Sequence, residues 1–331
     1  MIIAGDIGAT KTLLQFVECG SGRSRVAFEK RYPDAEYPDF ASLVSAFFGD
    51  ARASGLDTSS LEVAVLGIAA PVSGERVRLT NRDWVIDAQS LSSAFGVKSV
   101  RLVNDFAAAA RGIEMLAPSD LVTLQAGELE DKAPRVVLGA GSGLGIAYQV
   151  WTGERYRVIA GEGGNAGFAP ASPLQAQLWL ALHERTGHVS VEQVVSGKGL
   201  VAIYNFLREQ RAAPESPQLV QAMRTEDPAA AITAFALENN DPLASLALDL
   251  FVDAYGAVAG DHALSLLARG GVFVAGGIAP RIISRLQAGR FIASFRAKGR
   301  FAELMTGIPV RVVTNAGLGV LGATAIAMEM L

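Results

Sequence analysis

Short apolar runs separated by glycine-containing turns open the chain. One run covers residues 2–5, and a second covers residues 13–18 after a turn that contains Gly8. Strand, glycine turn and strand in this order are typical of a β-hairpin. A polar turn then leads to a third apolar run near residues 26–28, so we expect a third strand after the hairpin.

Helical and extended patterns alternate in the next part of the chain. Residues 39–55 carry apolar side chains at helical spacing, and residues 88–95 predict a second helix. Residues 61–70 form a dense apolar run that ends at Pro71 and predicts a buried strand. Residues 77–84 predict a further extended segment. This alternation of helices and strands indicates an α/β fold.

A strand that passes directly into a helix supplies the first candidate for chemistry. The mostly apolar residues 101–103 are followed by Asn104 and Asp105, and then by an alanine-rich helix opening at residues 106–110. A carboxylate at such a strand end faces the crevice in which α/β proteins bind ligands. Asp105 is therefore our candidate catalytic base. The alternative is that Asp105 only caps the helix, accepting hydrogen bonds from free backbone N–H groups.

The same order of elements begins again near residue 135. An apolar run at residues 135–138, a glycine turn at residues 139–145 and an apolar run at residues 146–151 resemble the opening hairpin in kind. We interpret this as an internal duplication at the scale of a domain, with coincidence between two hairpins as the alternative. The elements expected afterwards are helices near residues 174–184, 191–195, 200–210, 229–237 and 241–267, strands at residues 272–275 and 309–313, a helix from Pro280 and a helix at residues 318–330.

The repeated pattern predicts an α/β fold with two lobes around a central cleft. We expect a smaller lobe made of residues 1–108 and 315–331, and a larger lobe made of residues 109–314. A chain of 331 residues of which 50% are hydrophobic is long enough to build both cores. Because small-ligand sites favour domain interfaces, the cleft is where we expect a ligand to bind.

Composition and charge remove several classes of function. The 29 basic and 33 acidic residues are well mixed and give a net charge of −4, so we do not expect nucleic acid as a partner. The single cysteine, Cys19, excludes an intrachain disulfide and a cysteine-rich zinc site, and fits a reducing cytoplasm. No basic residue precedes the first apolar run, unlike in a signal peptide, and no uncharged apolar run has the length of a membrane span. We therefore expect a cytoplasmic protein that does not bind membranes.

The two glycine turns are the first constellation with a chemical meaning. Asp6, Thr10 and Thr12 line the first turn, and Ser142 lies in the second. Glycines let backbone N–H groups approach an anion closely, hydroxyl groups add donors, and a nearby carboxylate can hold Mg²⁺ through water. Neither turn has the Walker A spacing or the strand-to-helix context of a dinucleotide fingerprint. Together they predict a site for the phosphates of a magnesium nucleotide, with simple tight turns as the alternative.

Carboxylates and amides form the second constellation. Such groups accept and donate hydrogen bonds in fixed directions, which suits the recognition of several adjacent hydroxyl groups. Glu162 lies in a turn too rich in glycine to be a solvated charged face, and Glu192 opens the short helix expected at residues 191–195. The alternative for Glu192 is an acid that only stabilises that helix N-terminus. The three histidines lack a metal-ligand spacing and are treated as structural. The members of the constellation are Asn104, Asp105, Glu162, Asn165 and Glu192.

Six short motifs lie in order along the chain. They are Asp6-Ile7-Gly8-Ala9-Thr10, Val103-Asn104-Asp105-Phe106, Gly139-Ala140-Gly141-Ser142-Gly143-Leu144-Gly145, Gly161-Glu162-Gly163-Gly164, Glu192-Gln193-Val194-Val195-Ser196-Gly197 and Ala275-Gly276-Gly277-Ile278-Ala279-Pro280. In this order and at this spacing they resemble the bacterial ATP-dependent glucokinase family of the hexokinase and actin-like superfamily. The resemblance covers nearly the whole chain and implies two domains of the ribonuclease-H-like type. The lack of a cysteine-rich zinc motif is unlike the zinc-containing branch of repressors and sugar kinases.

The resemblance implies a role for each constellation. Asp105 would take the proton from the sugar 6-hydroxyl, and Asp6 would lie near the Mg²⁺ that accompanies ATP. The other hydroxyl groups of glucose or a related hexose would be held by Asn104, Glu162, Asn165 and Glu192. ATP would be held by Gly8, Ala9, Thr10, Lys11, Gly141, Ser142, Gly143, Gly276 and Gly277.

The sequence departs from the family pattern in two places. The family usually has Gly-Gly-His-Val-Asp-Phe at residues 163–168, so Asn165 replaces a histidine expected at the sugar and Gly167 replaces the following acid. The first glycine turn has Ala9 and Lys11 where glycine and asparagine are common. Because Asp105 is intact, we still expect catalysis, and the departures concern which sugar is preferred.

The sequence therefore predicts an ATP-dependent hexose kinase, foremost a glucokinase, that phosphorylates the 6-hydroxyl of glucose. The alternatives are a kinase for another hexose or an amino sugar, a sugar-binding sensor with weak catalysis, and a chaperone-type or actin-type ATPase. A sensor is expected to lose the base, and an ATPase does not need the cluster of Glu162 and Glu192. The oligomeric state is left open, with a homodimer among the options.

Overall fold

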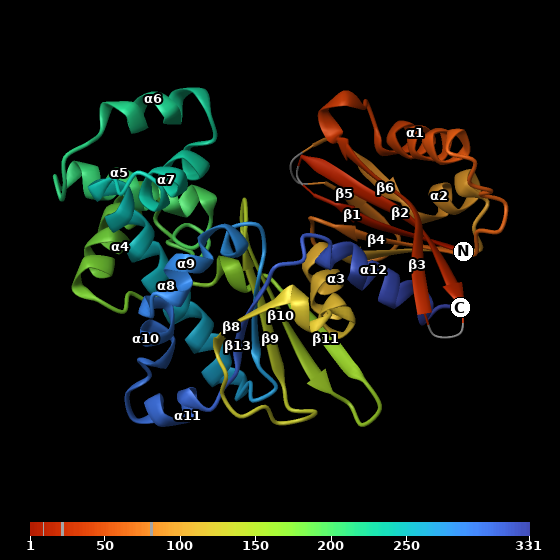
Figure 1. Ribbon diagram of the computed structural model, residues 1–331. Helices are drawn as coiled ribbons and strands as arrows, with labels where there is room; N and C mark the ends of the chain where they lie inside the picture. The colour runs from red at the N-terminus through yellow and green to blue at the C-terminus, as the bar shows by residue number, and fades with distance from the viewer. Residues whose placement is uncertain (9, 21–22, 80–81) are drawn as a thin grey trace. The chain divides into compact units, whose positions relative to one another are not determined.

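Two compact units make up the protein, whose computed structural model describes residues 1–8, 10–20, 23–79 and 82–331 (Figure 1). The first unit contains Met1–Pro118 and Asn315–Leu331, and the second contains Ser119–Thr314. The sequence analysis placed the first boundary after residue 108. The structural division comes later because α3 (Asp105–Gly112) packs against α12 (Leu318–Met328) inside the first unit. The assignment of these units as the two lobes of a kinase stays a prediction.

The first unit is built on a five-stranded sheet with the strand order β3-β2-β1-β4-β7. β1 and β2 form the antiparallel hairpin expected from the opening runs, and β3 extends it. β4 runs parallel to β1, and β7 runs parallel to β4. The strands are β1 (Ile2–Ile7), β2 (Lys11–Gly20), β3 (Arg23–Pro33), β4 (Val63–Ile68) and β7 (Ser99–Asn104).

Side chains of this sheet divide between two helical layers because successive residues of a strand point to opposite faces. One face packs against α1 (Phe40–Ala53) and α2 (Ala88–Phe95), where Phe16 stacks on Phe47 with ring centroids 4.5 Å apart. The opposite face packs against the C-terminal helix α12, which contributes Val320 to a smaller core. The last helix of the chain therefore completes the unit that contains the first strand.

The extended segment expected at residues 77–84 is a pair of short strands instead. β5 (Arg76–Arg78) and β6 (Val85–Asp87) form an antiparallel hairpin, and residues 80–81 lie outside the described residues. Trp84 is buried, and its indole N–H donates to the Pro38 C=O over 3.0 Å, so it anchors the start of β6. The short helices of the first part of the chain are η1 (Asp34–Glu36), η2 (Ile113–Met115) and η3 (Pro118–Asp120).

The second unit contains a six-stranded sheet with the strand order β11-β10-β9-β12-β13-β8. β9 and β10 form the second expected hairpin, β12 runs parallel to β9, and β13 runs parallel to β12. The edge strands β8 and β11 were not expected, because a strand covered on one side only shows a weak burial pattern. The strands are β8 (Leu121–Gln125), β9 (Arg135–Ala140), β10 (Leu144–Trp151), β11 (Tyr156–Gly161), β12 (Val272–Ala275) and β13 (Val310–Val313).

The two sheets share one topology, which confirms the internal duplication. In each sheet the first strand of a hairpin, β1 or β9, lies between its antiparallel partner and a parallel strand from later in the chain. The third strand extends the hairpin, and a further parallel strand follows on the other side. The two glycine turns therefore occupy equivalent places, at the β1–β2 and β9–β10 connections.

Helices of the second unit differ from expectation at several places. The helix expected at residues 191–195 is wrong: these residues form turns, with the Val195 N–H donating to the Val191 C=O over 2.8 Å. The reason is that Ser196 is extended, with φ −160° and ψ 175°, and caps α5, so no second turn of helix can follow. The helices α6, α10 and α11 were not expected. The helices are η4 (Gly163–Asn165), α4 (Pro173–Thr186), α5 (Gly197–Glu209), α6 (Pro217–Thr225), α7 (Pro228–Leu237), α8 (Pro242–Leu266), η5 (Ala279–Ile282), α9 (Ile283–Gln287), α10 (Arg290–Arg296), η6 (Gly299–Phe301) and α11 (Ala302–Thr306).

The helix α8 is the centre of the core of the second unit. Among the described residues it alone is long and apolar enough to cross a membrane, but 78% of its apolar window is buried inside the protein. Phe251 and Tyr255 are fully buried in this core. The aspartates of α8 form the ion pairs Asp249–Arg285, Asp253–Arg290 and Asp261–Lys298. A buried helix with paired charges has the properties of a core helix in a globular unit.

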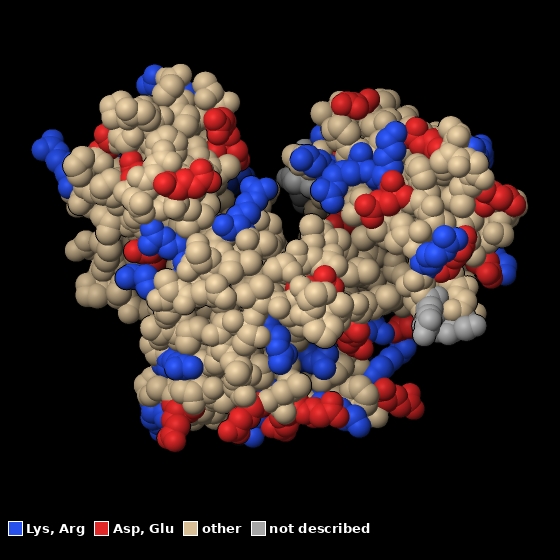
Figure 2. All heavy atoms as spheres, viewed as in Figure 1, with Lys and Arg blue, Asp and Glu red and all other residues tan. Residues whose placement is uncertain are grey.

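Acidic and basic side chains are interspersed on the face of the molecule shown in Figure 2. In the described part of the chain many acidic and basic side chains form pairs, such as Arg185–Glu209 and Lys30–Asp50, whose N···O distances are each 2.7 Å. Exposed pairs of this kind contribute little to stability. The mixed surface is what a balanced composition leads one to expect.

Candidate functional site

The parallel strands β1, β4 and β7 of the first unit have their carboxyl ends on the same side of the sheet, and three predicted site residues lie there. Asp6 of β1 is opposite Gly67 of β4, and Asn104 at the end of β7 is opposite Ile68 of β4. Gly67 allows close approach, since a Cβ added there would lie 3.5 Å from the Cα of Asp105. The sheet therefore brings Asp6, Asn104 and Asp105 to the same edge of the first unit.

Asn104, and not Asp105, is the N-cap of α3. The Ala107 N–H donates to Asn104 Oδ1 over 3.0 Å, and Asn104 Nδ2 donates to the Ala70 C=O over 3.3 Å. The alternative role of Asp105 as the helix cap is therefore wrong. One Nδ2 hydrogen of Asn104 remains beyond these bonds, so the side chain can still donate to a ligand hydroxyl.

Asp105 is the first residue of α3, in the turn where backbone N–H groups lack partners within the helix. The Phe106 N–H donates to Asp105 Oδ1 over 2.7 Å. The positive end of the helix dipole also stabilises a negative charge here. Asp105 is half-buried, so its carboxylate is supported by the helix while remaining accessible. A supported and accessible carboxylate is compatible with the predicted role of a general base.

Asp6 is half-buried at the end of β1. Burial raises its pKa to about 6, and the positive charge of Arg31 acts in the opposite direction. Gly319, in the first turn of α12, is so close that an added Cβ would lie 2.8 Å from Asp6 Oδ2. The described part of the chain contains no cluster of three histidine, cysteine or acidic residues that could hold a metal ion. A cation at Asp6 would therefore need water and phosphate as its other ligands, which fits Mg²⁺.

The first glycine turn presents its side chains to solvent. It joins β1 to β2, and the Gly8 N–H donates to the Lys11 C=O over 3.0 Å. The side chains of Thr10 and Lys11 are exposed. Ala9, also predicted to meet ATP, lies outside the described residues. The described positions leave hydroxyl and ammonium groups available to an anion.

Thr12 is not part of this open turn, contrary to the sequence analysis. It is buried, and its Oγ1 donates to Asp34 Oδ1 over 2.8 Å. The Asp34 N–H donates to the Thr10 C=O over 3.0 Å, and burial raises the pKa of Asp34. These contacts fix the start of β2 against η1 and so hold the base of the turn.

The second glycine turn (residues 141–143) is held by backbone hydrogen bonds on two sides. The Gly141 N–H donates to the Gly143 C=O over 2.8 Å, and the Gly197 N–H donates to the Gly141 C=O over 2.9 Å. Ser142 lies at its exposed tip. A fixed turn with an exposed hydroxyl has the arrangement expected of a phosphate-binding loop.

Gly276 and Gly277 lie beside the second glycine turn. Gly276 has a φ of +82°, and a Cβ added to it would lie 2.5 Å from the Ala140 carbonyl oxygen. The Ile278 N–H donates to that same carbonyl over 3.2 Å. Gly277 is exposed, with open space around its Cα. Both the left-handed backbone and the close approach require glycine at residue 276.

Glu162 and Asn165 lie in an acidic turn (residues 162–165) that follows β11. The Asn165 N–H donates to the Glu162 C=O over 2.9 Å, and both side chains are exposed. The Glu192 N–H donates to the Gly164 C=O over 2.8 Å. The structure therefore brings the predicted sugar-binding residues of the second unit onto adjoining backbone segments.

The Glu192 carboxylate contacts the second glycine turn as well. The Leu144 N–H, directly after that turn, donates to Glu192 Oε2 over 2.8 Å. A Cβ added to Gly143 would lie 2.4 Å from the same oxygen. Glu192 therefore contacts both constellations of the second unit, which the sequence analysis had treated as separate.

Two of the three histidines support the acidic turn, in line with the structural role expected of them. His188 Nε2 lies 3.0 Å from the Asn165 carbonyl oxygen. His262 of α8 has its Nδ1 2.8 Å from the Tyr148 hydroxyl, and a Cβ added to Gly163 would lie 3.6 Å from its Cε1. Burial lowers the pKa of His262. No spacing along the chain marks these residues, because tertiary packing alone brings them to the turn.

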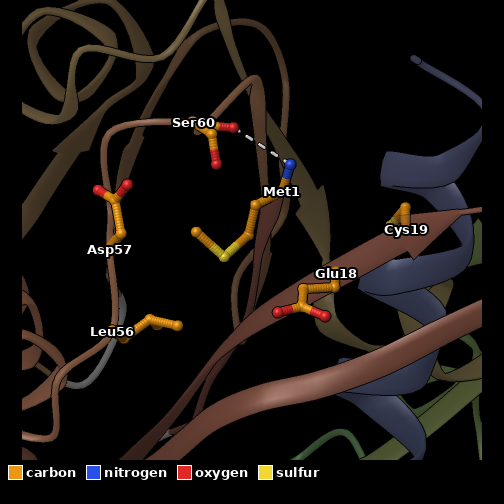
Figure 3. Close-up of a pocket in the computed structure, with 6 residues that line it drawn as sticks. All are labelled: Met1, Glu18, Cys19, Leu56, Asp57 and Ser60. Carbon is orange, nitrogen blue, oxygen red and sulfur yellow. Dashed lines mark hydrogen bonds between the residues drawn. The ribbon is translucent and has the colours of Figure 1, made fainter.

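A separate surface cavity of about 420 Å³ lies at the other end of β1 from Asp6 (Figure 3). There the N-terminal ammonium group of Met1 donates to the Ser60 C=O over 3.2 Å. Burial raises the pKa of the Cys19 thiol, which makes it a poorer nucleophile. No predicted site residue is among those that line it. The lining residues are Met1, Glu18, Cys19, Leu56, Asp57 and Ser60.

Known proteins that resemble this chain match it over nearly its full length. The family model described as "Glucokinase" matches residues 3–330. A glucokinase from Nostoc sp. is 40% identical, with 100% of this chain and 99% of that protein covered. A glucokinase from Synechocystis sp. is 42% identical, with 99% of this chain and 98% of that protein covered. The crystal structure of a glucokinase from an Antarctic psychrotroph is similar at a TM-score of 0.83 and 28% identity, with 99% of this chain and 98% of that chain covered. These similarities confirm the expected fold class.

Proposed function

The chain belongs to the glucokinase family, and on that premise we propose that it transfers the γ-phosphoryl group of ATP to the 6-hydroxyl of glucose. The observation that carries the proposal is the position of Asp105. It lies at a strand-to-helix turn, at the first residue of α3, in a chain that matches the family from end to end. A family member without a base at this position would bind the sugar and fail to phosphorylate it.

Asp105 acts as the general base in this proposal. The sugar 6-hydroxyl oxygen forms a bond to the γ-phosphorus of ATP, the bond from that phosphorus to the bridging oxygen breaks, and ADP leaves. The hydroxyl proton passes to the Asp105 carboxylate. Positioning and charge neutralisation supply most of the rate enhancement in phosphoryl transfer. The support from the N-terminus of α3 agrees with a carboxylate that stays charged until it accepts this proton.

ATP is assigned to the two glycine turns and to the segment Gly276–Gly277 beside the second turn. The phosphates would meet the first turn (Gly8, Ala9, Thr10 and Lys11) and the second (Gly141, Ser142 and Gly143). The adenosine would lie near Gly276 and Gly277. The assignment is supported by the equivalent places of the turns in two duplicated sheets and by the exposure of Thr10, Lys11 and Ser142.

Mg²⁺, when bound with ATP, neutralises charge on the phosphates. Asp6 would hold it through water molecules. The raised pKa of Asp6, about 6, supports this role, because a carboxylate that has lost hydration gains from a nearby cation. Gly319 has no side chain, and a larger residue there would press against the Asp6 carboxylate.

The sugar is assigned to Asn104, Glu162, Asn165 and Glu192. Glucose is the first candidate because the relatives with 40–42% identity are glucokinases. Another hexose or an amino sugar is the second candidate, because two residues in and next to the acidic turn depart from the family pattern. Asn165 replaces the usual histidine, and Gly167 leaves open space where the family usually has an acid.

A coupled assay for ADP tests the proposal. The purified protein, with Mg-ATP, is given glucose, mannose, fructose and N-acetylglucosamine in turn. We expect glucose to be phosphorylated, and Asp105→Asn to lower kcat by about 10²–10⁴-fold while glucose still binds in calorimetry. Asp131→Asn, at an exposed position, is the matched control.

Three outcomes would change the assignment. Wild-type kcat in Asp105→Asn with intact glucose binding would remove Asp105 as the base. Turnover with another sugar but not with glucose would favour the second candidate. No turnover with any of the four sugars would contradict the kinase.

A further inference from the structure

A single residue of the second unit, Glu192, joins two turns with different proposed roles, one through its side chain and one through its backbone. Glu192 Oε2 accepts the hydrogen bond from the Leu144 N–H, at 2.8 Å, directly after the second glycine turn. Gly143 lies against the same oxygen, where any side chain would displace the carboxylate. Among the described residues the Glu192 side chain makes no other hydrogen bond, so Oε1 can accept one from a ligand.

The backbone of Glu192 holds the other turn. Its N–H donates to the Gly164 C=O over 2.8 Å, in the middle of the acidic turn. A Cβ added to Gly164 would lie 2.2 Å from the Leu144 carbonyl oxygen. The two turns are therefore in direct backbone contact, and Glu192 is bonded to both. A shift of either turn must strain at least one of these contacts.

We propose that Glu192 is a positioning residue for the nucleotide in addition to a ligand of the sugar, and that it couples the binding of the two. The sugar contact rests on the proposed function, whereas the contact with the glycine turn is given by the structure. The bond from Leu144 fixes the orientation of the turn that would meet the phosphates. A carboxylate can serve Leu144 with one oxygen and a sugar hydroxyl with the other, while a carboxamide has a single acceptor atom.

Nucleotide affinity measured without any sugar separates this proposal from a role in sugar binding alone. The probe is AMP-PNP with Mg²⁺, titrated into the full-length protein by calorimetry. Glu192→Ala leaves the Leu144 N–H without its acceptor, and we expect the Kd for AMP-PNP to rise about tenfold, which is about 1.4 kcal/mol. A residue that contacted only the sugar would leave this Kd unchanged, and that result would overturn the proposal.

Glu192→Gln provides the rescue. Its carboxamide oxygen can still accept from Leu144, so we expect the Kd for AMP-PNP without sugar to return to within about twofold of wild type. The Kd for glucose should be higher than that of the wild type, because the second carboxylate oxygen is replaced by an NH2 group that can only donate. Equal loss of AMP-PNP affinity in the alanine and glutamine variants would contradict the hydrogen-bond account.

Two further variants complete the test. Glu162→Ala is the matched control: its carboxylate lies in the acidic turn, and we expect weaker glucose binding with an unchanged Kd for AMP-PNP. Should Glu192→Ala not fold, Gly143→Ala displaces the same carboxylate from Leu144 and carries the same expectation, with an unchanged Kd overturning the proposal.

The wild-type titration separates failure of this inference from failure of the proposed function. A wild-type protein that does not bind AMP-PNP at all would contradict the kinase itself. Wild-type binding that is unaffected by the loss of Glu192 would leave the kinase standing and remove the coupling.

Discussion

Asn165 is one of the two positions of the proposed sugar site, with Gly167, at which the sequence analysis found a departure from the family pattern. Its amide can donate and accept, but it is shorter than histidine and reaches a different point. A missed hydrogen bond in such a site costs about 1–3 kcal/mol, and about 1.4 kcal/mol is one decade in affinity. We therefore expect Asn165→His to lower the KM for glucose about tenfold and so to raise kcat/KM for glucose. Both quantities are to be measured with each of the four sugars. An unaltered kcat/KM for glucose would show that Asn165 does not limit the wild type.

His262 predicts a pH dependence of stability. Burial lowers its pKa in the folded protein below the ordinary value of 6.5, so the unfolded chain binds more protons as the pH falls. The stability that the neutral ring contributes is present above pH 6.5 and is lost at lower pH. We expect urea unfolding of His262→Gln to depend less on pH between 7.5 and 5 than that of the wild type. Parallel pH profiles for the two proteins would contradict the prediction. Asp261, whose charge favours the protonated ring, moderates the effect.

At the scale of elements, the contact between α3 and α12 determines how the helix bearing Asp105 is held. A Cβ added to Gly322 of α12 would lie 1.6 Å from the Ala108 carbonyl oxygen of α3. Overpacking of this kind costs about 1–3 kcal/mol. We expect Gly322→Ala to lower the free energy of unfolding in urea by at least that amount and to lower kcat, because α3 must shift.

Gly49 offers a matched control for that substitution. It lies on the exposed face of α1, with nothing within 4 Å of an added Cβ. Alanine in a helix is favoured over glycine by about 1 kcal/mol, so Gly49→Ala should stabilise the protein. If both substitutions changed the free energy of unfolding alike, the close helix contact would not be limiting.

For the whole molecule, the proposed sugar residues belong to both units. Asn104 and Asp105 are in the first unit, and the acidic turn and Glu192 are in the second. We expect saturating glucose to slow hydrogen–deuterium exchange at residues 103–107 and also at residues 161–167 and 188–193. Protection confined to one unit would mean that the other does not contact the sugar.

Much of the architecture was determined by the sequence alone. Burial on one or both faces of an element imposes a period on its apolar residues, so the core strands and long helices could be predicted within a few residues. The repeat of apolar run, glycine turn and apolar run predicted the duplicated sheets. The step from residues 101–103 into an alanine-rich segment placed Asp105 at a strand-to-helix turn, as the structure has it.

Features whose hydrogen-bond partners are distant in the chain were decided only by the tertiary structure. The edge strand β11 carries no strong periodicity, since its place is determined by hydrogen bonds to β10. Residues 191–195 have a helix-like sequence but form turns, because the extended Ser196 ends them and caps the next helix, α5. Asn104 takes the capping role considered for Asp105, and the Glu192 carboxylate reaches Leu144 across 48 positions of sequence. Local patterns report how an element is buried; which groups then meet depends on the packing of elements far apart in the chain.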